Sequence, residues 1–206
     1  MRHFLSGLLF LTLGLGISAV SAADFVEGKD YTKLATPQPD GGDKVEVIEF
    51  FWYGCTHCND FEPYISAWKK KVPENVKVTL VPAVFRPQWK IHAQTFYALE
   101  LLGLVDKLQS KIFDQIHKER KPANTIEEMT DMVVGLGVDR QEFIDATNSF
   151  VVDSQIRKAV KLLQDYKISG VPTMAVNGKY MTSAGLTGGY PQMLEVVDYL
   201  IGLESK

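Results

Sequence analysis

The chain has 206 residues, of which 46% are hydrophobic, and carries 22 Lys and Arg against 25 Asp and Glu. This length suits one ordinary globular domain, with room for an insertion. The mildly acidic balance gives no electrostatic reason to expect nucleic acid or an anionic membrane surface as a partner. With two cysteines in all, the chain is not a disulfide-rich scaffold.

Residues 1–22 have the pattern of a cleavable secretory signal peptide. Arg2 supplies the positive charge, Phe4 to Val20 form an apolar stretch, and Val20-Ser21-Ala22 are typical of a cleavage site. The alternative is a membrane anchor, for which an apolar stretch of about 17 residues is short. Cleavage after Ala22 leaves 184 of the 206 residues with a net charge of −4, in an exported protein for which disulfides are chemically accessible.

The first predicted strand covers residues 44–53, which are rich in β-branched and aromatic side chains on both faces, as in a buried parallel strand. An amphipathic helix is predicted to begin at or near Cys55 and to bend at Pro63. Its apolar stripe consists of Phe61, Tyr64, Ile65, Trp68 and Val72. A second strand is predicted over Val76 to Pro82.

Residues 87–167 show only helical periodicity, including a capping box from Thr125 to Glu128. Strands at 172–176 and 180–183 flank Asn177-Gly178, which is a strong hairpin signal. A final helix is predicted from Pro191 onward. This order predicts an α/β domain made of residues 23–86 and 168–206, interrupted by an all-helical insertion over 87–167.

Both cysteines lie in Gly54-Cys-Thr-His-Cys58, just after the first strand. A structural zinc site needs four ligands, and His57, His92 and His117 are too few and too scattered once the signal peptide is removed. Covalent haem attachment needs a histidine at position 59, which is asparagine. A disulfide that closes so short a loop adds little stability, although a structural bridge remains the main alternative to a redox-active dithiol.

If Cys55 and Cys58 form a redox-active dithiol, the two cysteines have different roles. Cys55 lies nearest the helix start, where free N–H groups and the helix dipole stabilise a thiolate, so we expect it to be the nucleophile. His57 can add a hydrogen bond or a positive charge, unless it is simply a solvated loop residue.

Glu49 lies on the same strand parity as Val45, Val47, Phe51 and Tyr53, so an acid is predicted where apolar side chains otherwise point. Burial would raise its pKa and make it a proton acceptor or an electrostatic tuner beneath Cys58. The alternative is a carboxylate that reaches solvent at the edge of the sheet.

Taken together, these segments resemble the DsbA family, the thioredoxin-fold thiol oxidases of the bacterial periplasm. The resemblance covers nearly the whole mature chain. It rests on Gly28-Lys-Asp-Tyr-Thr-Lys-Leu34, Glu49-Phe-Phe51, Cys55-Thr-His-Cys58, Asn148-Ser-Phe-Val-Val152, Gly170-Val-Pro172 and Asn177-Gly-Lys-Tyr180.

The resemblance implies a thioredoxin-like fold and a set of site residues. Cys55 would be the exposed nucleophile, Cys58 the buried cysteine, His57 the residue that stabilises the thiolate, and Glu49 the buried acid. Pro172 would follow a cis peptide bond, with the backbone of Val171 free to pair with a bound peptide.

Two positions depart from the best-known members of the family. Thr56 stands where they have proline, and the residues between the cysteines help to set the redox potential. They also pair the buried acid with a lysine on the next strand, where this chain aligns Leu80. Without that partner, Glu49 should be protonated more readily.

We therefore expect a monomeric periplasmic enzyme without a metal or cofactor that donates its Cys55–Cys58 disulfide to reduced, unfolded exported proteins. The resemblance implies reoxidation by a quinone-linked membrane protein of the DsbB type. An isomerase or reductase is an alternative, although too few residues precede the first core strand for the dimerisation domain of such enzymes. A second alternative is a non-catalytic peptide-binding chaperone that uses Phe51-Trp-Tyr53 as its anchor.

Overall fold

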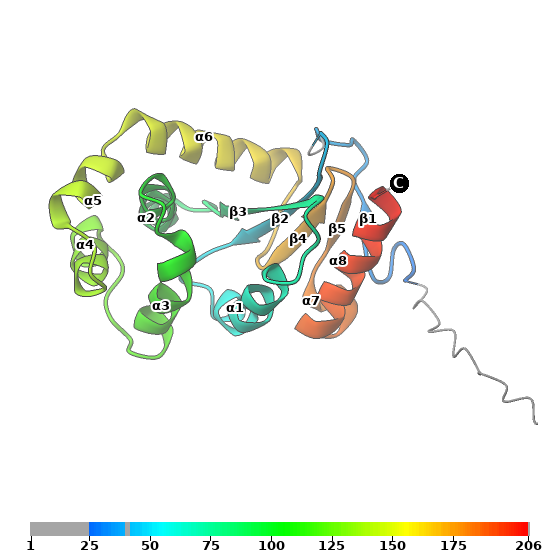
Figure 1. Ribbon diagram of the computed structural model, residues 1–206, viewed down its shortest axis with the longest axis horizontal. Coiled ribbons are helices and arrows are strands. Elements are labelled where there is room, and N and C mark those ends of the chain that lie inside the picture. The colour runs from blue at the N-terminus through cyan, green and yellow to red at the C-terminus, as the bar shows by residue number, and fades with distance from the viewer. Residues whose placement is uncertain (1–24, 40–41, 206) are drawn as a thin grey trace, which may run out of the picture.

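The computed structural model describes residues 25–39 and 42–205, and the expected signal peptide over 1–22 lies outside this part of the chain. A five-stranded sheet with the order β1-β5-β4-β2-β3 forms the centre (Figure 1). Its strands are β1 (Thr32–Lys33), β2 (Val45–Phe51), β3 (Val76–Pro82), β4 (Thr173–Val176) and β5 (Tyr180–Thr182). The β2–β3 pair is parallel and the other pairs are antiparallel.

Strand β2, which lies between β4 and β3, is buried on both faces, as its β-branched and aromatic residues predict. It pairs with β3 from Val45 opposite Val76 to Phe51 opposite Pro82. The predicted bounds of β3 are confirmed. Because β2 and β3 are parallel, the chain must cross over between them, and helix α1 (Thr56–Lys69) makes that crossover.

The Asn177-Gly178 turn joins β4 to β5, as predicted. Both residues have positive φ, 50° and 67°, which fits a two-residue turn whose twist matches that of the strands. A Cβ atom at Gly178 would lie 2.3 Å from the carbonyl oxygen of Gln38, so this position also needs the absence of a side chain.

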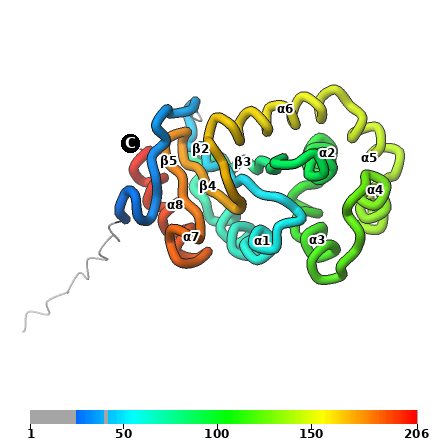
Figure 2. The backbone as a smooth tube through the Cα atoms, turned by 180° about the vertical axis from the view of Figure 1, so that it is seen from behind, coloured from blue at the N-terminus to red at the C-terminus, as the bar shows by residue number. Residues whose placement is uncertain are grey.

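Helices cover both faces of the sheet (Figures 1 and 2). On one face, α1 and the C-terminal helix α8 (Tyr190–Glu204) pack through Ile65 and Leu200 against Val47. On the other face, Ile48 and Phe50 join a second core cluster that continues into α6 (Phe150–Asp165). The short helix α7 (Ala184–Thr187) precedes α8.

A block of helices lies between β3 and β4 in the sequence and beyond the β3 edge in space (Figure 1). After a 3₁₀ turn at Pro87–Trp89 it comprises α2 (Lys90–Leu101), α3 (Val105–His117), α4 (Ile126–Gly135), α5 (Arg140–Thr147) and α6. The expected α/β thioredoxin-like fold with a helical insertion is thus confirmed. The division into domains at residues 86 and 168 stays a prediction.

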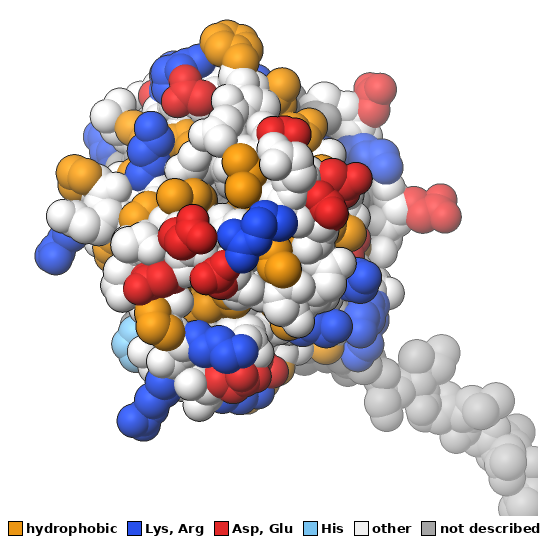
Figure 3. Space-filling model, turned by 90° about the vertical axis from the view of Figure 1, so that its left-hand side faces the viewer, with side chains coloured by type: hydrophobic (Ala, Val, Ile, Leu, Met, Phe, Trp, Pro, Cys, Tyr) orange, Lys and Arg blue, Asp and Glu red, His pale blue; other side chains and the backbone are white. Residues whose placement is uncertain are grey.

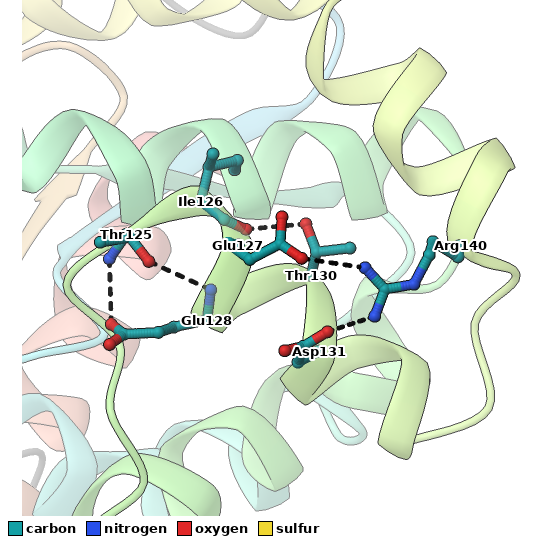
Figure 4. A network of polar contacts seen from close by, with 7 residues as sticks. All are labelled: Thr125, Ile126, Glu127, Glu128, Thr130, Asp131 and Arg140. Carbon is teal, nitrogen blue, oxygen red and sulfur yellow. Dashed lines mark hydrogen bonds and ion pairs between the residues drawn. The ribbon is translucent and has the colours of Figure 1, made fainter.

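The capping box predicted at the start of α4 is confirmed (Figure 4). The Thr125 hydroxyl accepts a hydrogen bond from Glu128 N at 3.2 Å, and the Glu128 carboxylate accepts one from Thr125 N at 3.1 Å. In the next turn, Arg140 of α5 bridges Glu127 and Asp131 of α4. These contacts fix the start of α4 and its junction with α5.

At the outer end of the helical block, positive and negative side chains are mixed on the surface and form no large patch of one charge (Figure 3). Among the described residues, no helix is both long enough and apolar enough to cross a membrane.

Candidate active site

Strand β2 ends next to the N-terminus of α1, and a tight turn joins the two elements. Cys55 N donates a hydrogen bond to Trp52 O at 3.0 Å, and Asn59 N donates to Cys55 O at 3.0 Å. Cys55 is the N-cap of α1, with extended backbone angles (φ −88°, ψ 118°). The predicted helix start is confirmed, and the first free N–H groups of α1 therefore point toward the Cys55 sulfur. The helix runs through Pro63, and the bend expected there stays a prediction.

The two cysteines, both free thiols in this structure, differ in accessibility. Cys55 is partly exposed, whereas Cys58, one turn into α1, is 1% exposed. The Cys55 thiol donates a hydrogen bond of 3.4 Å to Val171 O. The Val171–Pro172 peptide bond is cis, as the resemblance implies. Hence the accessible sulfur lies beside an irregular loop from the far end of the chain.

The pKa of Cys55 is lowered from 9.0 to about 6. The largest cause is a hydrogen bond from the Cys58 thiol; partial burial opposes it, and the backbone N–H groups of Cys58 and His57 add to it. The charge of His57 contributes least to the lowered pKa of Cys55. The helix terminus and His57 were predicted from the sequence to stabilise the thiolate, whereas the leading donor, the Cys58 thiol, was not.

Cys58 has the opposite electrostatic environment. Burial, together with its hydrogen bond to the Cys55 sulfur and the charge of that sulfur, raises the pKa of Cys58 far above its ordinary value. The charge of Glu49 raises it further. At neutral pH the pair therefore holds a thiolate at Cys55 and a proton on Cys58.

Glu49 lies in the interior on β2, at 2% exposure, and its Oε2 atom has no hydrogen-bond partner. Burial and then the charge of Glu62 raise its pKa from 4.5 to about 8, while Lys69 opposes the rise. The alternative of a solvent-reaching carboxylate is wrong. Leu80 is the cross-strand partner of Glu49, as the alignment predicted, so no cation stands at that position of β3.

A second buried acid, Glu62, was not foreseen. It lies on α1 at 5% exposure and accepts a hydrogen bond of 2.6 Å from the Ser110 hydroxyl of α3. Burial raises its pKa. The signal was present in the sequence, because Glu62 is four residues after Cys58 and so lies on the same face of the helix.

The turn between β2 and α1 is held by the helical block. Phe51 and Tyr53 are fully buried in the core, and His117 contacts Tyr53 O through Nε2 at 2.7 Å. The Trp52 ring stacks on Trp89 with a centroid distance of 3.7 Å and an interplanar angle of 5°. Core packing thus accounts for most of the aromatic segment that a chaperone would use as an anchor.

A cavity of about 580 Å³ is lined by His57, by residues 169–173 of the cis-proline loop, and by Tyr190 at the start of α8. Residues 183–185 and 188–189 complete its lining. His57 and Thr56 are both exposed. The sequence-predicted residues His57, Val171 and Pro172 therefore line one cavity, and the Cys55 sulfur contacts Val171 O at 3.4 Å. Cys58 and Glu49 are buried in the interior.

A sheet followed by a helix that starts with an accessible low-pKa thiol and has a buried cysteine three residues further on defines a class of protein. It is a thiol:disulfide oxidoreductase of the thioredoxin fold.

Comparison with known proteins identifies the family within that class. Residues 90–192 match the family described as "DSBA-like thioredoxin domain". The thiol:disulfide interchange protein DsbA of Azotobacter vinelandii is 46% identical over 97% of this chain and 94% of its own length. The crystal structure of Pseudomonas aeruginosa DsbA matches with a TM-score of 0.85 and 44% identity, covering 89% of this chain and 96% of that one. The chain belongs to the DsbA family.

A further solved structure holds a ligand. Proteus mirabilis DsbA, in complex with a non-covalently bound peptide, matches with a TM-score of 0.77 and 28% identity, covering 89% of this chain and 100% of that one.

Proposed function

We propose that this protein is a periplasmic oxidase that transfers the Cys55–Cys58 disulfide to reduced, unfolded exported proteins. The observation that carries the proposal is the contrast between the two sulfurs, with a stabilised thiolate at accessible Cys55 and a proton held on buried Cys58. Stabilising the reduced pair in this way makes the corresponding disulfide a stronger oxidant.

The transfer takes place in two steps. A substrate thiolate attacks the Cys55 sulfur, the Cys55–Cys58 bond breaks, and a mixed disulfide forms at Cys55. A second substrate thiolate then attacks the substrate sulfur of that mixed disulfide, and Cys55 leaves as a thiolate. Two electrons pass from the substrate dithiol to the cysteine pair. The low pKa of Cys55 supports its role as the leaving group in the second step.

Glu49 handles the proton of Cys58. When Cys58 leaves as a thiolate in the first step, it needs a proton, and a carboxyl group with a pKa of about 8 is mostly protonated at pH 7 and can supply it. In the reverse direction the same carboxylate accepts the proton before Cys58 attacks. The position of Glu49 within the buried region supports both roles.

The substrate binds as an extended peptide in the cavity beside the cis-proline loop. Val171 lines this cavity, and its carbonyl oxygen lies 3.4 Å from the Cys55 sulfur, which supports pairing of a bound strand close to the reacting atom. Thr56 and His57 border the entering sulfur. The bound peptide in the Proteus mirabilis relative supports peptide recognition as the mode of binding.

The cellular setting follows from the N-terminal pattern and the family. Cleavage of residues 1–22 releases the protein into the periplasm, where it works as a monomer. A quinone-linked membrane protein of the DsbB type reoxidises Cys55 and Cys58.

Trapping the mixed disulfide tests the proposal. Oxidised wild-type protein should oxidise a reduced peptide with two cysteines. Reduced Cys58→Ser, activated at Cys55 as a mixed disulfide with glutathione, should exchange glutathione for a peptide with a single cysteine and retain it, because that peptide has no second thiol to break the new disulfide. Cys55→Ser is the matched control and should retain none. Equal capture by both variants, or by Cys55→Ser alone, would contradict the assignment of Cys55 as the attacked sulfur.

A further inference from the structure

One face of α1 carries more than the buried cysteine. Cys58, Glu62, Ile65 and Lys69 are spaced by four, three and four residues, so they follow one another along the same side of the helix. The first three are buried and Lys69 is half-buried. The face therefore begins at the buried sulfur of Cys58 and ends at the positive charge of Lys69 in the last turn of the helix.

Two carboxyl groups lie next to this face without a close cation. Glu49 lies on the same face of β2 as Val47, which belongs to one core cluster with Ile65 of α1, and Glu62 belongs to the helix face itself. Within the described part of the chain, neither makes an ion pair, and Ser110 gives Glu62 a hydrogen bond from a neutral group. Each carboxylate disfavours the charge of the other, and the low dielectric of the interior strengthens that effect.

Lys69 is placed to offset this charge. It lines a cavity of about 490 Å³ together with Leu80, and Leu80 is the cross-strand neighbour of Glu49. Lys77 lines the same cavity, but its ammonium group is paired with Glu46 at 3.0 Å. In the described structure Lys69 makes no ion pair of its own. Consistent with this placement, the charge of Lys69 lowers the pKa of both Glu49 and Glu62.

We propose that Lys69 is a positioning residue for the thiol:disulfide reaction, a cation at the end of the active-site helix that keeps Glu49 able to take the proton of Cys58. The cross-strand neighbour of Glu49 on β3 is Leu80, which provides no positive charge. The inference rests on the proposed function, because it concerns a proton that moves only when the dithiol reacts.

The other charged or titratable groups around Glu49 determine whether its pKa is raised or lowered. From α1 these are Cys58 and Glu62, and from the end of β2 Tyr53, whose pKa is raised by burial and then by both glutamates. Asp114 of α3 raises the pKa of Glu62. All of these groups are neutral or negative. Lys69 is the cation that opposes them and favours the ionised form of Glu49.

The step to be measured is the release of glutathione from a mixed disulfide at Cys55. Cys58 gives its proton to the Glu49 carboxylate, and its thiolate attacks the Cys55 sulfur. The Cys55–glutathione bond breaks, and glutathione leaves as a thiolate that is protonated by solvent. At pH values below its pKa, Glu49 is ionised in only a small fraction of molecules. The rate of glutathione release should be proportional to that fraction.

Wild-type protein and variants are compared by single-turnover release of glutathione between pH 5 and pH 9. Lys69→Gln should shift the rise of rate with pH to higher pH and slow release about threefold or more at pH 6. Lys71→Gln removes the same charge from a nearby exposed position and should match wild type. Lys69→Arg keeps the charge and should restore the wild-type profile.

Glu62→Gln provides a test with the opposite sign. Removing this negative charge should move the profile to lower pH and speed release at pH 6, a result that general damage to the helix would not give. Identical profiles for Lys69→Gln and Lys71→Gln would overturn the inference. If wild-type protein released no glutathione in a Cys58-dependent step, the proposed function itself would fail.

Discussion

The contrast between the two cysteines predicts that reduced protein gains stability over oxidised protein as pH rises. The folded pKa of Cys55, about 6, lies below the ordinary value of 9.0. The thiolate's stabilisation is therefore complete above the unfolded pKa and is lost as pH falls through about 6. Oxidised protein has no thiolate and lacks this contribution.

The magnitude follows from linkage. Between pH 5 and pH 8 a shift of this size corresponds to ~2.5 kcal/mol in the free energy of unfolding. Cys55 is partly exposed, so solvent screens the interaction, and we expect about half of that value. The raised pKa of Glu49 costs stability as pH rises, but it does so in both redox forms and cancels in their difference.

The assay is denaturant unfolding of oxidised and reduced protein at pH 5 and pH 8. The reduced-minus-oxidised difference should rise by about 1.3 kcal/mol at the higher pH. Cys55→Ser has no thiolate to stabilise, so its pH dependence should match that of the oxidised wild type. A difference that stays constant, or falls, between pH 5 and pH 8 would refute the reasoning.

Three further predictions concern single side chains. The pKa of Cys55, read from thiolate absorbance, should rise more in Cys58→Ala than in Cys58→Ser, because serine keeps a hydrogen-bond donor; equal values would remove Cys58 as the leading cause. His57→Ala should raise the same pKa by less than one unit and make the disulfide less oxidising by under about 30 mV in a glutathione titration, because the backbone N–H remains. If the Cys55 pKa rose more in His57→Ala than in Cys58→Ala, His57 and not Cys58 would be the leading cause of the low pKa. Thr125→Ala should lower the free energy of unfolding by about 1 kcal/mol, whereas Thr125→Ser should keep most of the capping box; equal losses would contradict a hydrogen-bond origin.

Long, strongly patterned elements could be predicted from the sequence, and short ones could not. β2 and β3 have seven residues each and are rich in β-branched side chains, which leaves a clear pattern. β1 has two residues and is defined by its pairing with β5, which no local pattern announces. α7 has four residues, too few for helical periodicity to show.

The site was partly accessible to the same reasoning. Strand parity indicated that Glu49 is buried, and alignment placed Leu80 beside it. The cysteine motif gave the reacting pair, but which group stabilises the Cys55 thiolate most depends on a side-chain hydrogen bond that sequence does not reveal. Ser110 contacts Glu62 across α1 and α3, so their meeting depends on how the helical insertion packs.

The redox equilibrium of Cys55 and Cys58 against glutathione tests the central claim most directly. Protein is incubated with defined ratios of reduced and oxidised glutathione at pH 7, and the fraction of dithiol is measured after acid quenching and alkylation. An oxidase should remain mostly reduced until the buffer is strongly oxidising, because its own disulfide readily accepts electrons. A pair that is already oxidised in a mainly reduced glutathione buffer would be a structural bridge or a reductase, and would contradict the account.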